Sequence, residues 1–171
     1  MAMNPSEFTH PDDEQRAIEA RCLTALAQRE HSRAELVAKL HGFSPTAVEL
    51  VLDTLAARGW QSDARFAEAF VRNRLVRGQG RLKVRHELEA RGIHGELLRD
   101  VLDAADWAGA ARSAYLKKYS APATTAKEKA NRQRFLAQRG FSYDDIQQAM
   151  KATHDDTYTT HFHRRNPARL S

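Results

Sequence analysis

The chain is poor in cysteine: Cys22 is the only one among 171 residues. A single cysteine cannot form an internal disulfide, and it cannot build a zinc site from several thiolates. Cys22 lies four residues after Ile18 and four before Leu26, on one stripe of a helix. We therefore expect a buried core thiol, because a nucleophilic cysteine needs a partner base in an exposed, electropositive site.

The chain also lacks long apolar runs. None approaches the roughly 18–20 residues that a membrane-spanning helix requires. The first 15 residues carry Glu7, Asp12, Asp13 and Glu14 but no lysine or arginine, which is the opposite of a secretory signal peptide. These absences predict a cytoplasmic protein that does not enter a membrane.

The chain carries an excess of positive charge, and that charge is unevenly distributed along the sequence. The formal net charge is +5, made up of −3 in residues 1–61, +4 in 62–91, +3 in 92–152 and +1 in 153–171. An acidic first third and a basic remainder suggest a face built for an anionic partner. An ordinary solvated surface is the alternative.

The apolar residues recur at helical spacing along nearly the whole chain. Start signals are frequent: Ser32 with Glu35 has the spacing of a capping box, and Ser44-Pro45 places proline at a first helical position. The first helix is expected over Glu14–Glu30, and Ser62 or Asp63, Asp106 and Ser142 should cap later ones.

A repeat underlies this pattern. Gly42, Gly92 and Gly140 are spaced by 50 and then 48 residues, and the large apolar residues Phe43, Ile93 and Phe141 follow them directly. A left-handed glycine that ends one helix, followed by an apolar residue and a new helix, accounts for the pattern. A period near 50 indicates tandem supersecondary units.

The predicted fold is all-α, with three tandem three-helix repeats stacked in an elongated, curved array. The expected boundaries are an N-terminal tail at 1–13, repeats at 14–61, 62–104 and 105–152, and a disordered C-terminal tail at 153–171.

The segment Arg58–Arg74 reads RGWQSDARFAEAFVRNR, continues with Gly78-Gln79-Gly80-Arg81, and closes with Arg91-Gly92-Ile93. Gly-Trp, a polar cap, Asp-x-x-Phe-Ala, an arginine-rich helix, a Gly-x-Gly turn and a final Gly-Ile follow in order over 36 residues. This segment resembles the signature of the RecX family, and the likeness extends more weakly over residues 14–152.

The resemblance implies an all-helical regulator that binds the RecA–single-strand DNA filament in its helical groove. It implies inhibition of filament growth, ATP turnover, strand exchange and the SOS coprotease activity. It also implies a non-enzymatic protein without a cofactor or metal, whose partners are the RecA filament and single-stranded DNA, and which we expect to be a monomer.

A basic cluster lies inside the signature, and its members are the candidate RecA- or DNA-binding residues: Arg72, Arg74, Arg77, Arg81, Lys83, Arg85 and Arg91. At about 100° per residue, Arg74 and Arg77 share the face of Phe66 and Phe70, which favours a structural role for those two. For Arg72, Arg81, Lys83 and Arg85 we favour contact with filament protein or DNA over a plain surface role.

Other candidate sites have simpler interpretations. Trp60 and Trp107 could stack on bases, but core packing is favoured for both. Gly78–Arg81 could cradle a phosphate, yet it lacks the Lys-Ser/Thr of a P-loop, so an interhelical turn is expected. His154, His161 and His163 have no standard metal-ligand spacing.

Three rival functions stay open. The first is a stand-alone helix-turn-helix-like DNA-binding protein, although the arginines are spread over several helices. The second is a helical scaffold for another protein groove. The third is an enzyme, which would need an unrecognised site.

Overall fold

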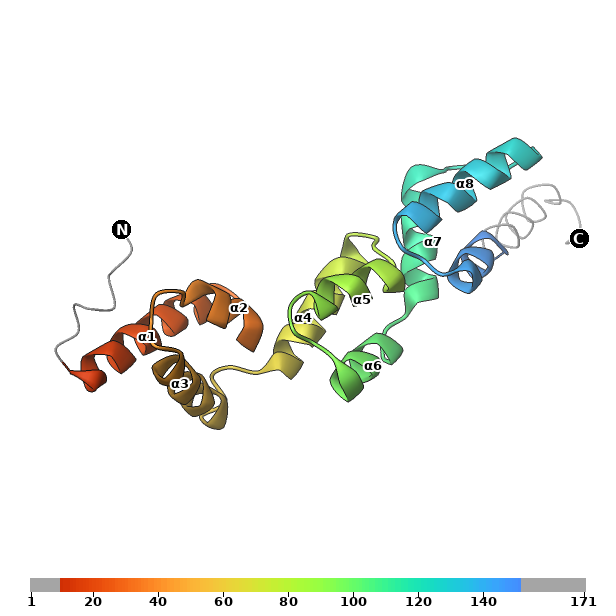
Figure 1. The fold of residues 1–171 in the computed structure, drawn as a ribbon. Coiled ribbons are helices and arrows are strands. Elements are labelled where there is room, and N and C mark those ends of the chain that lie inside the picture. The colour runs from red at the N-terminus through yellow and green to blue at the C-terminus, as the bar shows by residue number, and fades with distance from the viewer. Residues whose placement is uncertain (1–9, 152–171) are drawn as a thin grey trace, which may run out of the picture. The chain divides into compact units, whose positions relative to one another are not determined.

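The computed structural model describes residues 10–151, and every regular element in that range is a helix (Figure 1). The bounds are α1 Pro11–Leu26, α2 Arg33–Lys39, α3 Pro45–Ala57, α4 Asp63–Val76, α5 Arg81–Glu89, α6 Gly95–Asp103, α7 Trp107–Lys118 and α8 Ala126–Gln138. A further helix runs from residue 143 to 151. The predicted all-α class is confirmed, and the curved array stays a prediction.

The helices fall into two compact units. Within the described residues, the first combines 10–70 with Glu87–Val101, and the second combines Val71–His86 with 102–151. The middle helices therefore contribute to both units. The predicted C-terminal tail lies outside the described residues.

In the first unit, α1 packs on α3 around a core that includes α2. The predicted stripe of α3 is confirmed, because Val48, Val51, Leu52 and Leu55 are all buried. Its buried partners from the first two helices are Ile18, Cys22, Leu36 and Leu40.

In the second unit, α7 packs on α8, and their core continues into the helix that starts at residue 143. The core residues are Ala111, Ala114, Tyr115, Leu136, Phe141, Ile146 and Ala149. Core packing of Trp107 is confirmed: the ring is buried, and its Nε1 donates a hydrogen bond to the Leu102 carbonyl at 2.7 Å.

The bounds of α1 correct one expectation. The helix begins at Pro11 instead of Glu14 and ends at Leu26 instead of Glu30, so it overlaps the predicted tail at 1–13. Pro11 presets the first helical φ, and acidic Asp12 and Asp13 suit the positive end of the helix dipole. The sequence pattern missed this start because its first turn contains no large apolar residue.

The repeated glycines behave as expected. Gly42, Gly92 and Gly140 have φ values of +97°, +80° and +85°, in the left-handed region that L side chains rarely adopt. The predicted cap at Ser32 is also present, since its Oγ accepts from the Glu35 N–H at 3.1 Å. The Glu35 carboxylate does not complete the box but pairs with Arg29 at 2.8 Å.

Trp60 corrects another expectation, because its side chain is 47% exposed. Its backbone N–H donates to the Leu55 carbonyl at 2.9 Å, so Trp60 belongs to the closing turn of α3. The Arg58 guanidinium covers the ring at 5.2 Å from its centroid.

The first turn of α2 is held by the second repeat. The Arg33 N–H donates to Asp63 Oδ1 at 2.8 Å, and the same oxygen accepts from Gln61 Nε2 at 2.8 Å. A Cβ on Gly92 would lie only 2.8 Å from the Ala34 Cβ, so glycine permits this close approach.

The first turn of α5 makes the corresponding contact inside the second unit. The Gly80 N–H donates to the Arg139 carbonyl at 2.8 Å, and the Leu82 N–H donates to the Gly140 carbonyl at 2.9 Å. A Cβ on Gly140 would lie 2.5 Å from the Lys83 Cβ. In both units, therefore, the second helix of one repeat docks on the glycine turn of the next, as tandem stacking requires.

Burial makes a chemical prediction for Cys22. Desolvation, with a smaller contribution from Glu19, raises the pKa of the thiol to about 11. We therefore expect native protein to resist a thiolate-specific disulfide reagent at pH 8, and to react fully once unfolded in guanidinium chloride. Absorbance at 412 nm measures both rates, and rapid labelling of the native protein would contradict the burial.

Candidate functional site

The seven predicted basic residues lie on α4, on α5 and in the turns that follow them. Six of them, from Arg72 to Arg85, belong to the second unit, whereas Arg91 belongs to the first. Their surroundings differ enough to separate charges that the protein itself neutralises from charges that face solvent.

Arg91 is tied into the first unit. Its Nε lies 3.4 Å from Glu35 Oε1, and its guanidinium lies 4.8 Å from the centroid of the Phe70 ring. It also donates to the Glu87 carbonyl. These contacts give Arg91 a packing role, and its contact with a partner stays a prediction.

Two more arginines have internal partners. Arg81 pairs with Asp103, which leaves its side chain 39% exposed. Arg74 is half-buried, in agreement with its predicted place on the Phe66 face, and donates to Asn73 Oδ1 at 3.5 Å. The structural interpretation of Arg74 gains support from this burial.

Arg72, Arg77 and Lys83 form the uncompensated group. All three are exposed, and none makes an ion pair or side-chain hydrogen bond to another residue within 10–151. Arg77 leaves the face predicted for it because α4 ends at Val76 and Arg77 is already in the turn. Arg85 is exposed as well.

Two exposed apolar side chains accompany these cations, and the sequence did not single them out. Val76 is 76% exposed at the end of α4, and Leu82 is 59% exposed in the first turn of α5. The apolar residues of α5 do not share one face: Val84 and Leu88 are buried, whereas Leu82 lies about 200° around the helix from Val84 and is exposed. The exposure of Val76 could have been predicted, because it lies four residues after Arg72 and therefore on the same face of α4, and Arg72 is exposed.

The arrangement suits a partner that is acidic and also offers an apolar contact. Cations alone would hold phosphates, whereas a protein groove needs apolar or aromatic anchors as well. Gly78–Arg81 forms an interhelical turn, as expected, and its Gly80 docks on Arg139 as described above.

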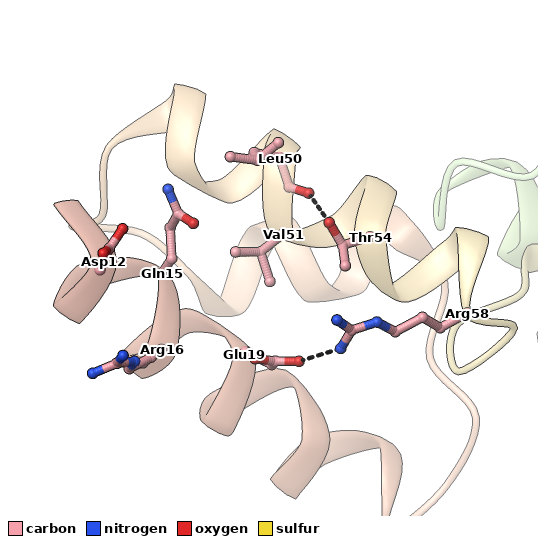
Figure 2. Close-up of a pocket in the computed structure, with 8 residues that line it drawn as sticks. All are labelled: Asp12, Gln15, Arg16, Glu19, Leu50, Val51, Thr54 and Arg58. Carbon is pink, nitrogen blue, oxygen red and sulfur yellow. Dashed lines mark hydrogen bonds and ion pairs between the residues drawn. The ribbon is translucent and has the colours of Figure 1, made fainter.

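A separate groove lies between α1 and α3 in the first unit (Figure 2). Its volume is about 260 Å³, and its lining residues are Asp12, Gln15, Arg16, Glu19, Leu50, Val51, Thr54 and Arg58. Arg58 Nη1 and Glu19 Oε1 pair across it at 3.1 Å, and the Thr54 hydroxyl donates to its own helix at Leu50. Arg58, Glu19 and Thr54 therefore have bonding partners within the protein, and they form no nucleophile–base pair.

Metal binding has no support in the described range. Residues 10–151 contain no group of three or more metal-ligating side chains, and the histidines considered above, His154, His161 and His163, lie outside it. None of the helices described has the length and apolarity needed to cross a membrane.

Comparison with known proteins gives consistent matches. The family models described as "RecX, second three-helix domain" and "RecX, third three-helix domain" match residues 62–102 and 108–150. "Regulatory protein RecX" of Chromohalobacter salexigens is 43% identical over 159 residues, covering 91% of this chain and 99% of that protein. The protein of the same description from Halorhodospira halophila is 39% identical, covering 82% and 90%.

Solved structures share the fold. A crystal structure of RecX from Lactobacillus salivarius superposes with a TM-score of 0.73 at 19% identity, covering 84% of this chain and 98% of that one. A second structure of a regulatory protein RecX gives a TM-score of 0.69 at 22% identity. At these identities, the structural likeness speaks for the fold alone.

Proposed function

This chain belongs to the RecX family of regulatory proteins, and we propose that it binds the RecA–single-strand DNA filament in its helical groove and inhibits RecA. The inhibited activities would be recombination, ATP hydrolysis and the SOS coprotease. The proposal places the protein in the cytoplasm, as a monomer without catalytic activity of its own.

The observation that carries the proposal is the uncompensated group Arg72, Arg77 and Lys83 beside exposed Val76 and Leu82. A nucleoprotein filament offers both kinds of contact, because it contains phosphates and protein grooves together. Charge attracts and orients such a partner, and apolar contacts slow its release.

A stand-alone helix-turn-helix-like DNA-binding protein fits the site less well. Base readout is concentrated on one recognition helix that bears amide or guanidinium groups. Here the free cations lie on α4, in the following turn and on α5. A strong sequence preference on naked duplex DNA would favour that rival.

The direct test is inhibition of RecA ATP hydrolysis on single-stranded DNA. We expect the triple variant Arg72→Glu, Arg77→Glu and Lys83→Glu to need at least about tenfold more protein for half-inhibition, a change of about 1.4 kcal/mol in binding. Circular dichroism should stay unchanged, because the charged ends of these side chains make no ion pair or hydrogen bond within residues 10–151.

A matched control reverses three exposed charges on α1, α2 and α6: Arg21→Glu, Lys39→Glu and Arg99→Glu. This control alters net charge equally and should inhibit like the unmodified protein. Equal inhibition by both triples would reject the α4–α5 site, and wild-type protein with no effect on RecA would reject the proposed function itself.

A further inference from the structure

The most basic part of the chain lies outside the signature segment. Residues 107–140, which contain α7 and α8, carry eight lysines and arginines and one acidic residue, Glu128, a net charge of +7. Five of the cations are exposed: Lys117, Lys118, Lys127, Lys129 and Arg134. The proposed function makes no use of this surface.

Carboxylates neutralise several arginines of the first unit, but they do not pair with the exposed cations of α7 and α8. In the first unit, Arg33 pairs with Glu49 and Asp53, Arg58 with Glu19, and Arg65 with Glu30. By contrast, the five exposed cations of α7 and α8 pair with no carboxylate within residues 10–151.

The one acidic residue of this segment serves its own helix. Glu128 completes a capping box with Thr125 at the start of α8, and its carboxylate accepts from the Thr124 N–H at 2.8 Å. That carboxylate therefore stabilises the helix terminus and is not placed to neutralise the exposed lysines.

Neutral groups hold three cations of this segment in place: Lys118, Arg132 and Arg139. The Arg132 guanidinium lies 4.6 Å from the centroid of the Tyr119 ring and donates to the Tyr115 hydroxyl at 2.7 Å. Lys118 Nζ and the Arg139 guanidinium lie 4.1 and 4.7 Å from the centroid of the Phe135 ring. Rings and hydroxyls order these side chains without supplying a negative charge of their own.

The exposed stripe of α8 combines charge with hydrogen-bonding amides. Lys127, Asn131, Arg134 and Gln138 follow one another at spacings of three and four, and all four are exposed. Lysine, arginine, asparagine and glutamine side chains are the usual donors to phosphate oxygens. The Tyr119 and Phe135 rings are already covered by cations, so they do not provide the open anchors that a protein groove requires.

We propose that α7 and α8 form a second contact surface, which binds the phosphate backbone of single-stranded DNA. The choice of single strand over duplex rests on the proposed function, in which the filament is built on a single strand. The surface itself rests on the five exposed cations, which pair with no carboxylate within residues 10–151, and its binding should depend on phosphates and not on base sequence.

The test is fluorescence anisotropy of a labelled 30-nucleotide oligothymidylate with the full chain, without RecA, between 50 and 200 mM NaCl. The variant removes three charges through Lys127→Gln, Lys129→Gln and Arg134→Gln. We expect at least tenfold weaker binding, and a salt slope that becomes shallower by about 2, since each phosphate contact on a single strand contributes roughly 0.7.

The matched control removes three charges from the first unit, through Arg21→Gln, Lys39→Gln and Arg99→Gln, and should bind within about twofold of the unmodified protein. Equal loss in both triples, or no salt dependence in the unmodified protein, would overturn the inference. So would a loss confined to a 30-base-pair duplex. RecA inhibition is measured separately on the same proteins. If the unmodified protein inhibits RecA but the α8 variant binds DNA normally, the inference fails while the proposed function stands.

Discussion

Replacing Gly80 with alanine is expected to lower the free energy of unfolding by about 3 kcal/mol, because the new methyl group has no room. A Cβ at this position would lie 2.2 Å from the Phe141 nitrogen and 2.3 Å from the Gly140 carbonyl carbon. Both are backbone atoms, so the clash cannot be relieved by a side-chain rotation. The turn would have to withdraw, and the bonds Gly80 N–H to Arg139 and Leu82 N–H to Gly140 would be weakened.

Urea unfolding followed by circular dichroism measures this effect, and Gly95→Ala is its control. Gly95 has a φ of +62°, but a Cβ there would meet nothing within 4 Å. Its substitution should therefore show only the backbone penalty of a left-handed residue, about 1 kcal/mol. If Gly80→Ala were no more destabilising than Gly95→Ala, the close approach of the two turns would be wrong.

The second large effect is expected at Phe66, whose side chain is only 3% exposed at the start of α4. Phe66→Ala removes the whole buried ring and with it the tilted contact with Phe70, at 5.7 Å between centroids. Truncations of this kind cost about 3–5 kcal/mol, from lost burial and the cavity that remains.

Leu82→Ala provides the comparison for Phe66→Ala, because Leu82 is 59% exposed and its truncation leaves no cavity. We expect a change of at most about 0.5 kcal/mol, as at ordinary surface positions. Thermal unfolding monitored at 222 nm ranks the two variants. Comparable losses would mean that the burial assigned to these two side chains is mistaken.

Local signals explain why much of the fold was predictable. Gly42, Gly92 and Gly140 mark helix ends because the left-handed backbone favours glycine whatever surrounds it. The stripe of α3 was also recognisable, since one face of a short amphipathic helix must be buried. Both features depend on residues close together in the chain.

Tertiary surroundings decided what the sequence could not. Gly92 looked only like a helix end, yet its missing side chain also lets Ala34 of the first repeat approach, where a Cβ on Gly92 would lie 2.8 Å from the Ala34 Cβ. Arg91 looked like a free cation, but it is neutralised by Glu35 from another repeat. Neither contact can be predicted from the periodicity of a single helix, because each joins residues that are far apart in the chain.

The basic surface of α7 and α8 was missed for a simpler reason. The net charge of residues 92–152 is only +3, because acidic residues at 96–106 and 144–145 offset the cations. The same residues counted helix by helix would have shown +7 in 107–140. The excess charge is therefore evident only within the bounds of α7, α8 and the loop between them.

Asp63 accepts hydrogen bonds from Arg33 and Gln61, and these bonds limit what truncated forms of the protein can show about binding. A fragment ending at residue 61 would keep all of α2 but discard the acceptor at its start, together with Arg65 and Arg91, the partners of Glu30 and Glu35. Such a piece would unravel at its cut edge, and a binding assay would report that damage as lost affinity. Point substitutions in the intact chain are consequently the sounder route to dissecting its repeats.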